Sequence, residues 1–166
     1  MSDVSSLRHR AFSAKLAVHR ITAFYNEFKR TDLAQRVPET QDTLSGHQLK
    51  VLLEEFQDVC RRMESALFEE VTRLSVDAEY AVNSYAKAHY GFAPGEDIDV
   101  TLPTAEGHPH FRVIKVFLQS GTESDVRVDA TQIGADGTPG ARWDIFMKAP
   151  GQVQADKSIK RDASAR

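Results

Sequence analysis

The chain has 166 residues, of which 41% are hydrophobic and 27% are charged, and its formal net charge is −3. This composition suits one domain or two small ones with a buried core, and it excludes disordered and collagen-like chains. Cys60 is the single cysteine, which excludes an internal disulfide and a multi-thiolate zinc site and fits a reducing compartment.

The chain shows no signal-peptide core at its N-terminus and no apolar run of about 18 residues that could span a membrane. We therefore expect a cytoplasmic protein without membrane contact. Charge is unevenly distributed: residues 1–37 carry seven Lys and Arg against three Asp and Glu, whereas residues 38–91 carry five against ten. A basic segment followed by an acidic one indicates that the two pack on each other, or that the basic one binds nucleic acid.

The first predicted element is an amphipathic helix of about 30 residues. Its apolar residues recur at alternating steps of four and three over three heptads, the pattern of a helix that packs lengthwise on a neighbour. These residues are Leu7, Ala11, Ala14, Val18, Ile21, Tyr25 and Phe28. We expect the helix to end near Val37, because the residue before Pro38 is disfavoured in the α conformation.

The second predicted element is a longer helix from about Ser45 to Tyr90. Ser45 and Gln48 have the spacing of a capping box, and Asp42 and Thr43 are competing caps. Two successive steps of four between Met63 and Val71 interrupt the repeat; such a stutter locally unwinds a supercoil without ending the helix. Gly91 is placed to end the helix in the left-handed conformation. The apolar positions are Leu49, Leu52, Phe56, Val59, Met63, Leu67, Val71, Leu74, Ala78, Ala81, Tyr85 and Ala88. A break at the stutter would instead give three shorter helices in a compact bundle.

Acidic residues of the second helix face basic residues of the first in an antiparallel hairpin, which is the arrangement we predict. The second helix is the longer one, so part of its apolar face must be buried by the C-terminal segment or by another chain. We expect association through the apolar positions Leu7, Val18, Ile21, Tyr25, Phe28, Leu52, Phe56, Val59, Met63 and Leu74.

The C-terminal part predicts a small antiparallel β-meander. Alternating residues predict strands over 97–102, 125–130 and 141–147, and the turn residues of 134–140 separate the last two. Residues 111–118 are apolar on both faces, so periodicity does not separate strand from buried helix, and we predict a strand. The predicted fold is α+β: a long helical hairpin with a coiled-coil-like seam over 1–92, a β-rich module over 93–148, and a mobile basic tail over 149–166.

His108 and His110 could place two imidazoles on one face of a strand, as some metal sites do. A third ligand would come from His89, Asp97 or Glu106, whose positions nothing fixes, so we predict no metal and no cofactor. The chain contains no phosphate-loop, dinucleotide-binding, zinc-protease or nucleophile-elbow motif, and no base is placed to activate Cys60. We therefore expect a protein that is not an enzyme.

Several segments together resemble the N-terminal region of Gag polyproteins from Bel/Pao-type LTR retrotransposons. They are the basic helix RAFSAKLAVHRITAFYNEF, the longer helix with FQDVCRRME, the element DAEYAVNSYAKAHY, and the linker LPTAEG followed by Phe111, Ile114 and Leu118. Two residues depart from the family pattern. Ala105 stands where the family usually has an aromatic residue, and Phe111 stands in place of the usual Trp, one residue early. The resemblance covers about residues 8–118 and implies a truncated or repurposed Gag-like protein with a helix at 111–118.

The resemblance also implies a structural, self-associating role. We therefore expect a structural, assembly or adaptor protein, Gag-like or a virion component, that forms homo-oligomers or binds a protein partner through its long helices. The alternative is a nucleic-acid-binding module that uses the basic tail and the basic residues of the first helix. Those residues are Arg8, Arg10, Arg20, Lys29 and Arg30. A small metalloprotein at His108 and His110 is the weaker alternative.

Overall fold

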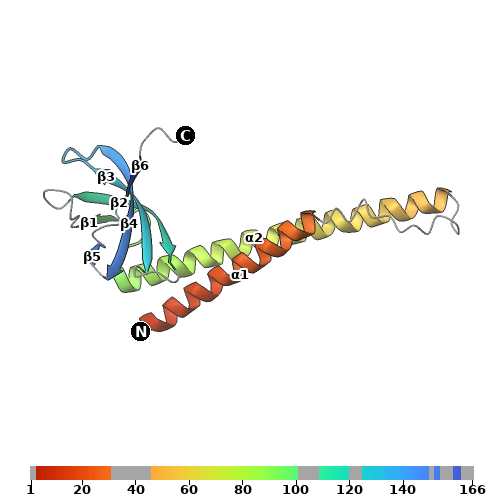
Figure 1. Ribbon diagram of the computed structural model, residues 1–166, viewed down its shortest axis with the longest axis horizontal. Coiled ribbons are helices and arrows are strands. Elements are labelled where there is room, and N and C mark those ends of the chain that lie inside the picture. The colour runs from red at the N-terminus through yellow and green to blue at the C-terminus, as the bar shows by residue number, and fades with distance from the viewer. Residues whose placement is uncertain are drawn as a thin grey trace. The chain divides into compact units, whose positions relative to one another are not determined.

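The structure, a computed structural model, describes residues 3–30, 46–100, 109–119, 125–149, 152–153 and 159–161. Two helices, α1 (Val4–Arg30) and α2 (Gly46–Tyr90), precede an antiparallel sheet (Figure 1). The predicted α+β class and the predicted helical hairpin are therefore confirmed. The capping residue Ser45 and the predicted stop at Val37 lie outside the described residues.

Contacts divide the chain into two compact units. The sheet unit comprises residues 1–13 and 79–166, and the two-helix unit comprises residues 14–78. The division falls inside both helices, whereas sequence patterns place a boundary near residue 92, where helix gives way to strand.

The two-helix unit consists of the antiparallel parts of α1 and α2 (Figure 1). The rings of Tyr25 and Phe68 lie 6.3 Å apart, and Lys29 Nζ lies 3.1 Å from Glu64 Oε1. The latter is one of the ion pairs expected between a basic first helix and an acidic second one. α2 passes through the stutter as a continuous helix of 45 residues, as predicted for the long hairpin.

The end of α2 follows the prediction for Gly91. This glycine has φ of +87°, and its N–H donates to the Lys87 carbonyl at 3.2 Å. A residue without a Cβ adopts this left-handed conformation at little cost, so the helix ends here. The Lys87 ammonium then pairs with Glu96 Oε1 at 2.7 Å, which ties the helix end to the loop before the sheet.

In the part of the chain that the structure describes, the sheet has six antiparallel strands. They are β1 (Asp97–Asp99), β2 (His110–Leu118), β3 (Val126–Ile133), β4 (Pro139–Ala149), β5 (Gln152–Val153) and β6 (Ile159–Arg161). The strand order is β1-β2-β3-β4-β5, and β6 also pairs with β4. The segment 111–118 is thus a strand, as its local pattern predicts, and the helix implied there by the Gag resemblance is wrong. Two short parts of the predicted tail, β5 and β6, are strands because β4 offers them unpaired backbone groups.

A β-bulge explains why apolar residues of β2 occur at both alternating phases of its sequence. Its pairing with β3 shifts register between Val113 and Lys115. Phe111 and Val113 are buried before the bulge, and Val116 and Leu118 are buried after it. The inserted residue moves the inward-facing positions to the other phase of the sequence, so both phases carry apolar residues.

The core of the sheet unit lies where the sheet meets the helix segments of the same unit. Tyr85 of α2, Phe111 of β2 and Ile145 of β4 are each less than 2% exposed. The ring of Phe111 meets Trp143 edge to face with centroids 6.0 Å apart. At the rim, Arg8 Nη2 of α1 lies 2.6 Å from Asp125 Oδ1, and Tyr85 donates a hydrogen bond to the same carboxylate at 3.4 Å. Within the described residues neither helix has a segment apolar enough to cross a membrane.

Candidate functional site

The first half of α2 extends past the described residues of α1. Tyr25 lies opposite Phe68 and Lys29 opposite Glu64, so four residues forward in α1 match four residues backward in α2. Continuing this register by one residue places Arg30, the last residue of α1, opposite Met63. The described residues of α1 therefore provide no counterpart for residues 46–62 of α2.

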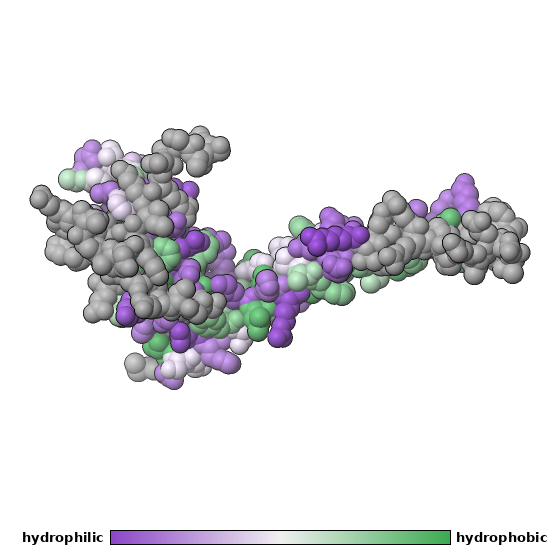
Figure 2. All heavy atoms as spheres, viewed as in Figure 1, coloured by the Kyte–Doolittle hydropathy of each residue, from purple (hydrophilic) through white to green (hydrophobic). Residues whose placement is uncertain are grey.

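Four large apolar side chains of this segment form what we call the apolar stripe. The stripe consists of Leu52, Phe56, Val59 and Met63, whose exposed fractions are 50%, 41%, 43% and 46%. Steps of four, three and four residues keep all four on one face of the helix. In Figure 2 apolar surface, drawn in green, is visible along the two-helix unit.

The residues of α2 that contact α1 in the two-helix unit lie to one side of the apolar stripe. At about 100° per residue, Glu64 and Phe68, which contact α1, lie roughly 130° around the helix from the centre of the stripe. The half-buried positions Leu67, Val71 and Leu74 lie between these two directions, so the stripe and the side that contacts α1 adjoin each other. A partner could thus occupy the stripe while α1 remains in place.

The association residues predicted from the sequence therefore separate into two sets. Leu7, Val18, Ile21, Tyr25 and Phe28 of α1, together with Leu74 of α2, are half-buried within the chain. The four residues of the stripe are exposed. Among the predicted association residues that the structure describes, only the second set is exposed.

The basic residues of α1 are not gathered on one surface. Arg8 pairs with Asp125 and Lys29 pairs with Glu64, whereas Arg10, Arg20 and Arg30 are exposed. At about 100° per residue the five positions are distributed around the whole circumference of the helix. They also belong to different units, since only Arg8 and Arg10 lie in the sheet unit. This placement does not form the continuous basic face that binds a nucleic-acid backbone.

Charged residues that link β1 to β2 form a cluster that sequence patterns did not reveal. His110 Nδ1 lies 2.7 Å from Asp99 Oδ1, and Arg112 Nε donates to Asp97 Oδ1 at 2.8 Å. The hydrogen bond to Asp99 raises the pKa of His110, and the hydrogen bond from Arg112 lowers the pKa of Asp97. The register pairs Asp97 with Arg112 and Asp99 with His110, so strand pairing brings together residues that are distant in sequence.

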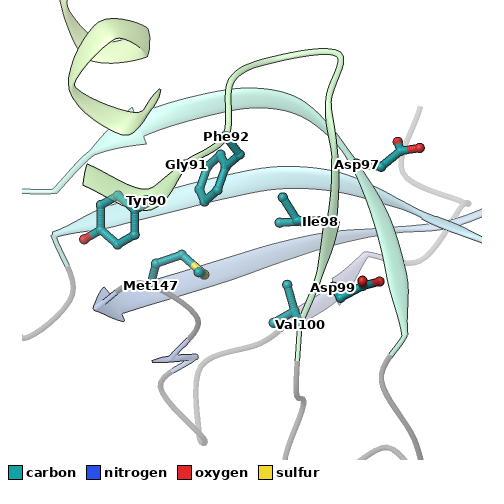
Figure 3. A pocket seen from close by; sticks show the side chains of 8 residues that line it. All are labelled: Tyr90, Gly91, Phe92, Asp97, Ile98, Asp99, Val100 and Met147. Atoms are coloured by element: carbon teal, nitrogen blue, oxygen red, sulfur yellow. The ribbon is translucent and has the colours of Figure 1, made fainter. Parts of the chain in front are cut away.

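A cavity of about 190 Å³ lies beside this cluster (Figure 3). Its lining residues are Tyr90, Gly91, Phe92, Asp97, Ile98, Asp99, Val100 and Met147. Figure 3 shows the side chains of Ile98 and Val100 directed toward Met147 and the two carboxylates directed away, as alternation along a strand requires. Burial raises the pKa of Tyr90. The two aspartates are already paired with side chains of β2, so we assign no reaction to this cavity.

The structure describes only part of the predicted alternative for metal binding. Among the described residues, no three His, Cys, Asp or Glu side chains are grouped so that they could hold a metal ion. His108 and Glu106 lie outside the described residues, and His89 stacks on Tyr85 with ring centroids 5.5 Å apart. Cys60 is a free, half-buried thiol on α2.

Comparisons of the chain with models of protein families, with curated proteins and with solved structures find no match. The resemblance to Gag polyproteins therefore rests on the sequence motifs.

Proposed function

We propose that this protein is a non-enzymatic structural or assembly protein that works by self-association through the apolar stripe of α2. The observation that carries the proposal is the exposure of Leu52, Phe56, Val59 and Met63 in one continuous row. Exposed rows of large apolar side chains on a folded protein are typical of interaction sites.

The spacing of the stripe supports a helix as the partner. Steps of three and four residues present side chains to a neighbouring helix as knobs that fit between its own side chains. A partner helix of the same kind is available in every second copy of the chain. Self-association is also the role that the resemblance to Gag polyproteins implies, and it suits a virion component equally well.

A test of the proposal compares two exposed phenylalanines. Phe56 belongs to the stripe, whereas Phe24 lies on α1 and is 55% exposed. We expect Phe56→Asp to abolish association, because a charge would be buried in the contact. Phe24→Asp should leave association unchanged. Sedimentation velocity at tens of micromolar, with circular dichroism to confirm folding, measures both.

Equal sedimentation of the wild type and both variants as monomers would contradict the proposal. An equal loss of association in both variants would move the contact away from the stripe. Stoichiometric binding of a different protein by a monomeric chain, lost in Phe56→Asp, would replace self-association with an adaptor role.

A further inference from the structure

The apolar stripe has two neighbours of opposite charge on one flank. Glu55 and Arg62 are seven residues apart, so they occupy equivalent positions beside the row, and both are exposed. Among the described residues neither forms an ion pair, although Arg62 Nε donates to the Asp58 carbonyl at 3.4 Å. A row of apolar residues flanked by charges at heptad spacing is the arrangement through which paired helices select orientation.

An antiparallel pairing of two stripes matches the largest side chain, Phe56, with the smallest, Val59, and pairs Leu52 with Met63, which is of similar size. When Phe56 lies beside Val59 of the second copy, Leu52 lies beside Met63 of the second copy. A two-fold axis between Gln57 and Asp58 then generates the same contacts in reverse, so the same patch serves both molecules. Each of the four stripe residues has a partner in this register.

The charges favour the same orientation. In the antiparallel register Glu55 lies beside Arg62 of the second copy, and symmetry gives a second such pair. In a parallel, in-register pairing Glu55 would lie beside Cys60 of the second copy, and Arg62 beside Leu67. The parallel arrangement would also place Phe56 against itself. Only the antiparallel pairing therefore satisfies both the shape and the charge of the stripe.

We propose that two copies of the chain pair through α2 in this antiparallel register, with Leu52 beside Met63 and Glu55 beside Arg62 of the second copy. The inference rests on the proposed self-association and adds its orientation. The contact with α1 through Tyr25 and Lys29 lies on another side of α2, so the pairing leaves the helical hairpin intact.

Disulfide cross-linking in the full chain tests the orientation. In a Cys60→Ser background, Leu52→Cys and Met63→Cys are made as separate variants. The proposal predicts that an oxidised mixture of the two gives a covalent dimer, whereas neither does alone. In the antiparallel dimer the two Leu52 positions are separated by 11 residues, or about 16 Å of helix, far beyond the roughly 7 Å that a disulfide can bridge.

Three other results of the cross-linking experiment would each contradict a different part of the proposal. Efficient cross-linking of each single variant with itself would show a parallel pairing and overturn the orientation, while the proposed self-association would stand. No cross-linking in a chain that remains dimeric by sedimentation would place the contact elsewhere. A monomeric parent chain would overturn both proposals.

Charge reversal provides a second test that does not depend on cysteine chemistry. Glu55→Arg and Arg62→Glu each create two like-charge pairs in the antiparallel dimer, and we expect each to raise the dimer dissociation constant about fivefold. The double variant restores both pairs, so its dissociation constant should return to that of the wild type. Additive weakening in the double variant would overturn the proposed register.

Discussion

The two units of the molecule carry similar apolar side chains but bury them very differently. In the sheet unit Phe111 is 0% exposed and Met147 is 3% exposed. In the two-helix unit Phe56 is 41% exposed and Met63 is 46% exposed. The same residue types therefore form a closed core in one unit and an open surface in the other.

The difference follows from element length. Strands β2, β3 and β4 match one another over most of their lengths, so the apolar residues of the sheet unit find partners within the chain. α2 has 45 residues and α1 has 27, so one helix must extend past the other. An unmatched length of amphipathic helix is stable only if something covers it or if its exposed area is tolerated. This contrast is the reason why we propose α2 as the site of association.

Truncating matched phenylalanines should give the largest effect. Phe111→Ala removes a fully buried ring and should lower the free energy of unfolding by about 3–5 kcal/mol. Phe56→Ala, in the stripe, should lower it by about 0.5 kcal/mol or less at concentrations below association. Denaturant titration followed by circular dichroism measures both, and Trp143, the single tryptophan, reports on the sheet unit. Similar losses in the two variants would remove the contrast between a closed and an open unit.

Substitution of Gly91, at the end of α2, should lower the free energy of unfolding by a smaller amount. Gly91→Ala places a Cβ in a conformation with φ of +87°, and nothing lies within 4 Å of that atom. The cost is therefore conformational, about 1 kcal/mol in the free energy of unfolding. Gly91→Asn should cost less, because asparagine tolerates the left-handed region. Neither change should alter association, and a loss of association would contradict the separation of the two roles.

The cluster between β1 and β2 should make stability depend modestly on pH. The hydrogen bond to Asp99 raises the pKa of His110 above its usual 6.5. The stabilisation is fully present below the unfolded-state pKa and is lost as the pH rises through the higher folded-state pKa. The difference in unfolding free energy between wild type and His110→Asn should thus shrink as the pH rises from about 6 to 8. Asp97 and Arg112 remain charged throughout this interval, and a pH-independent difference would contradict the assignment.

We expect no measurable binding of nucleic acid. Fluorescence anisotropy with single-stranded RNA and duplex DNA at about 50 mM salt should detect no binding, because the basic residues of α1 do not share a face. Salt-sensitive binding that weakens in a triple variant with Arg10, Arg20 and Arg30 changed to alanine would support the alternative function. That result would move the functional surface from α2 to α1.

The regular parts of the fold could be predicted from the sequence. Heptad spacing predicted both helices and the continuity of α2, and Gly91 marked its end, because these features depend on residues that are close in sequence. The four main strands were also predicted. β5 and β6 were missed because short strands are stabilised by their neighbour, β4, rather than by their own residues.

The sequence did not predict which apolar positions of the helices are half-buried within the chain and which are exposed in the stripe. Spacing alone does not say which residues of α2 face α1, because that depends on where α1 ends. Charge patterns likewise placed Arg8 opposite α2, whereas it pairs with Asp125 of the sheet unit. The pairing of His110 with Asp99 arises from strand register, which joins residues 11 positions apart in the sequence.

Light scattering of the purified wild-type chain tests the central claim most directly. The account predicts that, as the concentration reaches tens of micromolar, the measured mass rises from 18.5 kDa toward twice that value. The rise should be absent in Phe56→Asp, because that variant places a charge in the contact. A wild-type chain that remains at the monomer mass at these concentrations would contradict the claim that the apolar stripe of α2 is a self-association surface.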